Sequence, residues 1–247
     1  MITNAVITWI RDACLGLLDF LYPSGCVECG IIGEGYLCGA CVKKIIYIDE
    51  PFCKHCGIHL DSDNKNFCPK CEFDFGFHDG GISIALYEKP LSTLIHRLKY
   101  QKEIGIAKLI SRLALSRLVS SQQIDSLKSD LIHPVPLFSK RQSARGFNQS
   151  ALIAGAIASE TGMHYADNLL KRVRDTKSQT GLTYDERAMN VQNAFAVRND
   201  VDLNGRSVLL VDDVMTTGAT IQECARALKN AGAGTVKFIT VARQLLE

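Results

Sequence analysis

The chain of 247 residues has little net charge and few aromatic residues. Lysine and arginine exceed aspartate and glutamate by only two, and a single tryptophan is present. So small a net charge excludes a histone-like protein whose bulk charge binds nucleic acid, and any such contact must come from a local patch. Apolar residues still make up 47% of the chain, enough for a sizeable core, and the length favours two domains of unequal size.

Long apolar runs are also absent from the amino-terminal segment, where a membrane anchor or an export signal would be expected. Arg11, Asp12 and Asp19 interrupt every apolar window there, and no basic residue precedes the apolar part. A membrane span needs ~18 apolar residues, and a signal peptide needs a basic start. We therefore expect a cytoplasmic protein with no membrane span. Residues 1 to 22 are expected to form a short amphipathic helix that docks on its own domain or, as a second interpretation, binds a partner.

Cysteine, by contrast, is concentrated in one segment, and only Cys14 and Cys224 stand apart from it. Two Cys-x-x-Cys turns supply the tetrahedral four-sulfur shell that Zn²⁺ prefers, so four turns predict two structural zinc ions and a double zinc-ribbon domain over residues 23 to 75. The four turns are Cys26 with Cys29, Cys38 with Cys41, Cys53 with Cys56, and Cys68 with Cys71.

This segment is small and rich in glycine, so metal ligation would supply much of its folding free energy, on the order of 10 kcal/mol per site. A disulfide framework would require export, and regular paired turns favour zinc over an iron–sulfur cluster. Two arrangements remain open: consecutive turns can share a zinc ion, which the short loops favour, or the turns can interleave. His55 and His59 could replace a ligand but are not needed, and the two isolated cysteines are expected to be buried.

After Cys71 the composition changes, and apolar runs alternate with helical patterns. This alternation predicts an α/β domain with a mostly parallel central sheet over residues 82 to 247, preceded by a linker at residues 76 to 81 (GFHDGG). Strands are expected at residues 82–87, 131–135, 195–197, 208–211 and 236–241, and helices at residues 91–99, 103–118, 148–161 and 219–230.

The stretch VLLVDDVMTTGAT, residues 208 to 220, runs from a buried strand into two adjacent acids, Asp212 and Asp213. Ligands of parallel sheets bind outside the carboxyl ends of the strands. Residues 214 to 220 are small or hydroxylated, and their backbone N–H groups could hold a phosphate at the start of the next helix. Two adjacent carboxylates can accept two vicinal ribose hydroxyls, and Mg²⁺ or positive charge on the sugar would relieve their repulsion. The stretch therefore predicts a sugar-phosphate site.

The same stretch resembles the phosphoribosyl pyrophosphate (PRPP) signature of type I phosphoribosyltransferases. Residues 133 to 154 and 176 to 197 resemble two further hallmark stretches of the ComF family, and the cysteine turns resemble its amino-terminal double zinc ribbon. The resemblance covers nearly the whole chain. It implies a type I phosphoribosyltransferase-like domain that binds PRPP with Mg²⁺, and a cytoplasmic role in natural competence, assisting the uptake or handling of transforming single-stranded DNA. The ribbons would contact this DNA or a DNA-uptake helicase.

By this resemblance, the two acids would contact the ribose hydroxyls and act in catalysis. A mobile loop at residues 172 to 187 would cover the site. Lys171, Arg172 and Arg174 lie at its start and could also meet an anion. The other PRPP-binding residues implied are Val214, Met215, Thr216, Thr217, Gly218, Ala219 and Thr220 around the 5′-phosphate, and Lys140, Arg141 and Arg145 near the pyrophosphate.

Other functions remain open. An active phosphoribosyltransferase in nucleotide salvage would transfer the ribosyl group to a base, and a zinc-ribbon adaptor would carry a vestigial sugar-phosphate site. A response-regulator receiver also has paired acids after its first strand, but too few residues follow Asp213 to complete one.

Several nearby residues have structural interpretations. The basic run at residues 171 to 177 is also typical of a solvated loop. Asn148 is expected to cap the helix that begins there, and Tyr100 is expected to be packed rather than to stack on a base. His96 and His133 receive no role.

Overall fold

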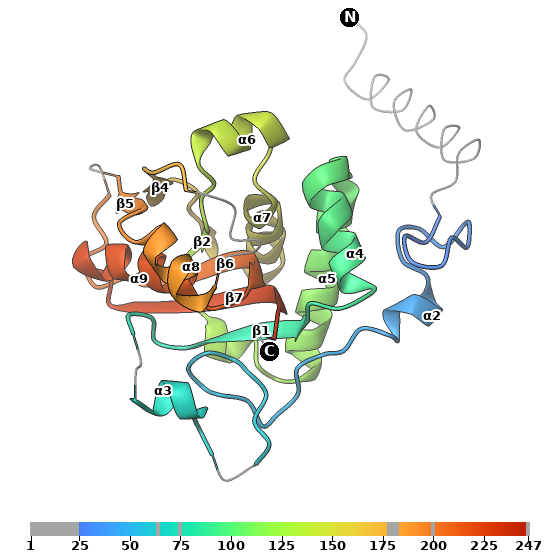
Figure 1. The fold of residues 1–247 in the computed structure, drawn as a ribbon, viewed down its shortest axis with the longest axis horizontal. Helices are drawn as coiled ribbons and strands as arrows, with labels where there is room; N and C mark the ends of the chain where they lie inside the picture. The colour runs from blue at the N-terminus through green and yellow to red at the C-terminus, as the bar shows by residue number, and fades with distance from the viewer. Residues whose placement is uncertain (1–24, 63–64, 74–75, 177–182, 199–200, 246–247) are drawn as a thin grey trace, which may run out of the picture.

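The protein is built around a five-stranded parallel sheet, with strand order β1-β7-β6-β2-β3 (Figure 1). The computed structural model describes residues 25–245 except 63–64, 74–75, 177–182 and 199–200, so the expected helix over residues 1 to 22 and Cys14 lie outside the described residues. The strands of the sheet are β1 (Gly81–Leu86), β2 (Leu131–Pro134), β3 (His164–Tyr165), β6 (Ser207–Met215) and β7 (Thr235–Arg243).

Strand β6 lies in the middle of the sheet and is buried on both faces. Leu209 and Val211 belong to one hydrophobic core, whereas Val208 and Leu210 belong to the other. Side chains of a strand alternate between its faces, so a strand covered on both sides must be apolar throughout, which explains the uninterrupted VLLV run. The first core is covered by α4 (Leu91–His96), α5 (Gly105–Ser120) and α7 (Gln149–Thr161), and the second by α9 (Ala219–Asn230).

One expected strand lies outside the central sheet. The expected strand at residues 195–197 is present as β5 (Phe195–Val197), but it pairs antiparallel with β4 (Leu170–Arg172) outside the central sheet. The basic run therefore begins in a strand. Further short elements are α2 (Gly39–Val42), α3 (Pro69–Phe73), the π-helix η1 (Arg97–Gln101), η2 (Asp125–Leu127), α6 (Ser139–Arg145) and α8 (Tyr184–Val191). None of the helices in the described part of the chain is long and apolar enough to cross a membrane.

The linker expected at residues 76 to 81 leads into β1 and is fastened to the large domain. The Asp79 carboxylate accepts the backbone N–H of Val236 and pairs with the Lys229 ammonium, both at 2.7 Å. The backbone N–H of Phe77 donates to the Gln222 side chain at 2.6 Å. These contacts fasten the segment to β7 and α9.

The two cysteine-rich segments flank the sheet, and the connector between them joins its edge. Residues 46–48 run antiparallel to β1: the N–H of Ile48 donates to the carbonyl of Ile84 at 3.0 Å, and the N–H of Leu86 donates to the carbonyl of Ile46 at 2.8 Å. The first segment packs with α4 and α5 in one core, and the second lies below β1 in Figure 1.

Candidate functional site

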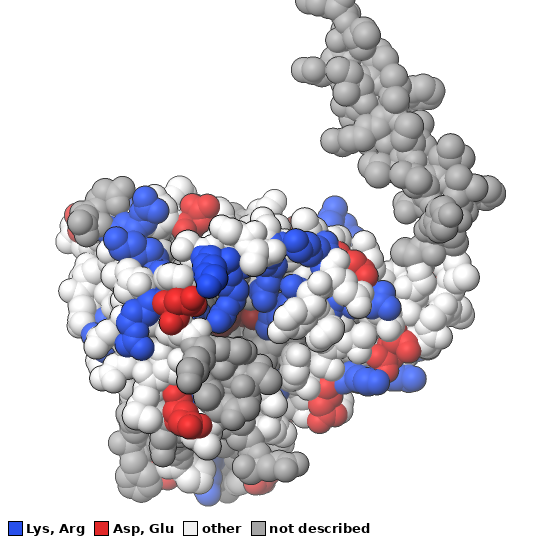
Figure 2. Space-filling model, turned by 45° about the horizontal axis from the view of Figure 1, so that its top comes forward, with Lys and Arg blue, Asp and Glu red and all other residues white. Residues whose placement is uncertain are grey.

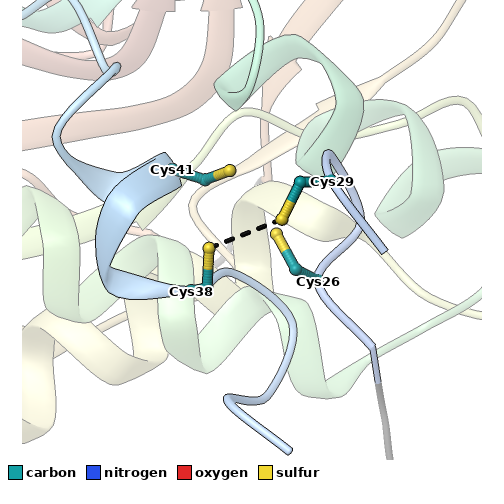
Figure 3. Close-up of side chains that lie close together, drawn as sticks. All are labelled: Cys26, Cys29, Cys38 and Cys41. Carbon is teal, nitrogen blue, oxygen red and sulfur yellow. Dashed lines mark hydrogen bonds between the residues drawn. The ribbon is translucent and has the colours of Figure 1, made fainter. Parts of the chain in front are cut away.

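The eight clustered cysteines form two groups of four. In each group the four sulfur atoms lie within 4.8 Å of one another, and Figure 3 shows those of the first group converging on one point. The sulfur atoms of Cys29 and Cys38 are 3.6 Å apart, and those of Cys56 and Cys68 are 3.8 Å apart. Zn–S bonds of 2.3 Å in a tetrahedron place the sulfur atoms about 3.8 Å apart, whereas a disulfide needs about 2.05 Å. Both groups therefore fit structural zinc.

The groups also decide how the turns are paired. Cys26, Cys29, Cys38 and Cys41 form the first and Cys53, Cys56, Cys68 and Cys71 the second, so consecutive turns share a site, as the short loops favoured. Bound zinc cross-links each segment.

Residues outside the groups have other contacts. His55 stacks on His78 with ring centroids 3.9 Å apart, and the Nδ1 of His59 lies 3.3 Å from the carbonyl oxygen of Asp49. Cys224 is fully buried in the core beneath α9, as expected.

Asp212 and Asp213 lie inside β6 and not directly after it. The strand continues to Met215 because β7 pairs with it up to Arg243. Val214 and Met215, which we expected in the phosphate loop, therefore belong to the strand. The Asp213 side chain points to the face covered by α7, and the residue is only 4% exposed.

A lysine neutralises part of the charge of the acid pair. The Lys99 ammonium, from η1, forms an ion pair with Asp213 Oδ2. Two residues in the first turn of α7 also reach the acids: Gln149 Nε2 donates to Asp213 Oδ1 at 3.4 Å, and Ser150 Oγ donates to Asp212 Oδ1 at 2.9 Å. The two carboxylates are therefore held by one cation and two hydrogen-bond donors.

The first turn of α7 is fixed by the expected cap. Asn148 Oδ1 accepts the backbone N–H of Ser150 at 3.0 Å, and its Nδ2 donates to the carbonyl of Val135 at 3.0 Å. The cap ties the start of α7 to the segment that follows β2. It thereby positions Gln149 and Ser150 beside β6.

The two acids titrate differently. Burial and the neighbouring charge of Asp213 raise the pKa of Asp212 to about 7. Burial also raises the pKa of Asp213, but the Lys99 ammonium outweighs it and holds this pKa below its ordinary value. The pKa of Lys99 is in turn raised, because the attraction of Asp213 exceeds the effect of burial. Near neutral pH the pair is therefore one firmly ionised acid beside one that is half protonated.

The candidate phosphate loop, Thr216 to Gly218, connects β6 to α9. Gly218 has φ +82°, and a Cβ there would lie 2.7 Å from the terminal methyl of Met215, so the position requires glycine. Thr217 Oγ1 accepts the N–H of Ala219 at 3.3 Å. The loop leads into a helix of twelve residues, whose amino-terminal dipole favours an anion.

The candidate pyrophosphate residues lie on α6, which follows β2 at the same edge of the sheet. Arg145 donates to the side chain of Gln149, which brings it toward the acids. Arg141 donates to the carbonyl of Thr176 at 3.0 Å, and Lys140 is exposed. Only Arg145 of these three is joined to the acid pair by described contacts.

The cations of the expected mobile loop have other partners. Arg172 donates to the Thr176 hydroxyl and lies over the Phe195 ring, 5.2 Å from its centroid. Arg174 donates to the carbonyl of Gln192 at 2.5 Å. Residues 177–182, the middle of that loop, lie outside the described residues.

Sequence reasoning missed Lys99, Gln149 and Ser150. Gln149 and Ser150 belong to a stretch that we interpreted only as a helix start. The three consecutive polar residues at 148–150 (NQS) could have indicated that this helix start contributes to the site. Lys99 lies on a π-helix, which hydropathy periodicity does not predict, although such turns are frequent at functional sites. On the same π-helix Tyr100 is 65% exposed, so the expectation that it is packed was wrong.

A cavity of about 670 Å³ lies between the phosphate loop and the second zinc ribbon. Arg243 lines it and joins its two walls: Nη1 donates to the carbonyl of Cys56 at 2.5 Å and lies 3.3 Å from Met215 Sδ. Other lining residues include Ile58, Phe77, Met189, Thr217 and Leu245.

Comparison with known proteins defines the class. Residues 17–72 match the double zinc ribbon domain, and residues 148–245 match the phosphoribosyl transferase domain. The fold and the two matches define a phosphoribosyltransferase-type protein with an amino-terminal zinc ribbon.

Curated relatives define the family. "Competence protein F" of Haemophilus influenzae is 33% identical over 88% of this chain and 96% of its own length. "DNA utilization protein YhgH" of Escherichia coli K12 is 32% identical over 87% and 93%, and "Competence protein ComFC" of Streptococcus pneumoniae is 25% identical over 85% and 89%. The chain belongs to the ComF family.

The cysteine groups generate a prediction about metal content. Protein purified without chelator should contain about two zinc ions per chain, from the ligand count, and either Cys26→Ser or Cys53→Ser should lower this to about one. Elemental analysis of the purified variants measures it. Cys224→Ala, which removes a buried thiol outside the groups, should keep both ions. Zinc content near zero in the unaltered protein would contradict the assignment.

The acid pair generates a prediction about stability. Because the pKa of Asp212 is raised, its contribution to folding is present below about pH 4 and lost as pH rises through about 7. Asp212→Asn should therefore raise the melting temperature at pH 8, by roughly 2–4 °C for each kcal/mol added to the free energy of unfolding. At pH 5 the increase should be smaller.

Asp213→Asn is the matched control and should have the opposite sign. The lowered pKa of Asp213 means that its contribution is present above pH 4, and its loss leaves the Lys99 ammonium without its partner. Thermal melts of both variants at the two pH values test this. The same sign for both substitutions at pH 8 would refute the assigned asymmetry.

Proposed function

We propose that the protein binds PRPP, or a related ribose phosphate, with Mg²⁺ at the carboxyl edge of the sheet. We further propose that it acts in the cytoplasm in natural competence, assisting the uptake or handling of transforming single-stranded DNA, in contact with the DNA or a DNA-uptake helicase. One observation carries the first part: β6 presents two adjacent acids and leads directly into a glycine-dependent loop at a helix start. The names of its relatives, which refer to competence and DNA utilization, support the second.

The proposed ligand makes use of each charged group. Thr216 to Thr220 would hold the 5′-phosphate, and Asp212 and Asp213 would accept the vicinal ribose hydroxyls. Lys140, Arg141 and Arg145 would meet the pyrophosphate, for which guanidinium groups are suited. Because the pKa of Asp212 lies near neutrality, arrival of a cation would ionise it fully.

Carboxylate oxygens are the hard ligands that Mg²⁺ prefers, so Asp212 and Asp213 suit a site that shares the ion with the pyrophosphate. When bound, the ion would neutralise charge on that group. If transfer occurs, the bond from ribose C1 to pyrophosphate oxygen breaks, its electron pair leaves with pyrophosphate, and the acceptor forms a new bond to C1. The two carboxylates would then stabilise the positive charge that develops on the sugar.

A second candidate is an active phosphoribosyltransferase in nucleotide salvage. The cavity of about 670 Å³ favours it, because its volume can hold a base and residues Thr216 to Gly218 of the phosphate loop line it. Here the second zinc ribbon would form the wall that reads the acceptor, with Arg243 between the ribbon and the loop.

The ligand assignment predicts a loss of binding in an acid-pair variant. Isothermal titration should detect PRPP binding in the presence of Mg²⁺, and Asp212→Asn combined with Asp213→Asn should abolish it, because both hydroxyl acceptors lose their charge. Asp125→Asn, an exposed acid paired with Lys128, serves as the control. Unchanged affinity in the double variant would refute the site.

Pyrophosphate release separates the two candidate functions. For a binding protein we expect PRPP to be held without release that depends on a base. The assay should use a panel of bases, nucleosides and single-stranded DNA. Acceleration by one base would establish the salvage enzyme and displace the first candidate.

A further inference from the structure

The basic side chains are unevenly distributed over the molecule. Residues 23 to 75, which contain both zinc ribbons, carry eight acidic and five basic residues. Helix α6, by contrast, has three basic residues and no acid in the stretch SKRQSAR. Figure 2, in which the top of Figure 1 with α6 comes forward, shows lysine and arginine gathered across the upper part of the visible face, with a few acidic residues among them. An acidic ribbon is a poor electrostatic surface for DNA, so the basic face is the better one.

The cations of this face lack acidic partners among the described residues. No ion pair in that part of the chain involves a residue of α6 or β4. Arg141, Arg145 and Arg172 donate to a carbonyl, an amide and a hydroxyl, none of which carries a negative charge. A polyanion would neutralise these groups without displacing an existing ion pair.

An exposed aromatic ring lies beside these cations. Tyr100 is 65% exposed. The Arg145 guanidinium lies 5.9 Å from the centroid of its ring, and the centroid of the His96 ring lies 4.7 Å from the same point. An aromatic ring and a guanidinium at the edge of a basic surface are the groups on which unpaired bases stack.

We propose that Tyr100 and Arg145 form a stacking platform for a base of single-stranded nucleic acid, whose phosphates follow the basic residues of α6. A duplex does not fit this platform, because its bases are already stacked on one another. The proposal rests on the proposed role in handling single-stranded DNA. It makes the basic face, rather than the zinc ribbons, the surface that contacts the DNA. The bound DNA would then lie close to the two acids, because Lys99, the neighbour of Tyr100, forms an ion pair with Asp213.

Binding of a fluorescein-labelled oligothymidylate, followed by anisotropy over a range of salt concentrations, tests the platform. Tyr100→Ala should weaken binding roughly tenfold, because base stacking is lost. It should leave the slope of log K against log salt unchanged, because no contact with a phosphate is removed. Tyr100→Phe keeps the ring and should bind like the unaltered protein. Lys140→Ala should reduce the slope of log K against log salt by about 0.7, the value for one contact with a single strand.

Lys44→Ala is the matched control for charge, because Lys44 is exposed and lies between the ribbons. It should change neither affinity nor slope. If Lys44→Ala weakens binding and Tyr100→Ala does not, the ribbons are the contact surface and the platform is refuted.

Titration of the same samples with PRPP separates this proposal from the proposed function. Tyr100→Ala should retain PRPP binding, so an effect confined to DNA supports the platform. Failure of the unaltered protein to bind the oligonucleotide would overturn both the platform and the DNA part of the proposed function, and would leave the PRPP site standing. If the unaltered protein binds the oligonucleotide, Tyr100→Ala weakens that binding and no PRPP binding is found, only the assignment of the sugar-phosphate site would be overturned.

Discussion

Two carboxylates on consecutive residues of a buried strand repel each other, and the ammonium of Lys99 makes their burial tolerable. Lys99 reaches Asp213 from a π-helix, and the capped start of α7 places Gln149 and Ser150 on the same pair. Two separate segments, η1 and the start of α7, thus meet the acids of β6. Because the attraction of Lys99 acts mainly on one acid, the other keeps a pKa near neutrality. The pair therefore combines an acid whose pKa is lowered with one whose pKa is raised.

The long elements of the fold could be predicted from the sequence, whereas several of the short ones could not. The uninterrupted apolar run of β6 and the amphipathic pattern of α9 are strong local signals, which a core on each side of the sheet requires. Strands β3 and β4 span two and three residues, too few for a periodic pattern. The placement of β5 outside the sheet depends on its pairing with β4, which no local pattern encodes.

The candidate site shows the same division. The acids, the phosphate loop and the cysteine turns are contiguous in sequence and were predicted, although β6 extends past the acids because β7 pairs with it. Lys99 comes from a segment more than a hundred residues earlier, and only the tertiary fold brings it to Asp213. Tyr100 was misjudged because aromatic residues are usually packed, and the π-turn that exposes it has no hydropathy pattern.

The second ribbon is joined to the sheet at the position that matters for ligand binding. Arg243 lies at the end of β7, opposite Met215, and holds the carbonyl of Cys56, a zinc-ligand residue. A metal site and the start of the phosphate loop are thus separated by one buried side chain. The ribbon thereby forms a wall of the cavity and is joined to the end of β7.

The connector between the ribbons has a consequence for solubility. Strand β1 is an edge of the sheet, and residues 46–48 occupy its free backbone groups. An uncovered edge strand is a template for pairing with another chain. The connector lies between the two cysteine groups and is also held by an ion pair between Arg117 and Asp49. It covers an edge strand that contains no cysteine, and so keeps that edge from pairing with another chain.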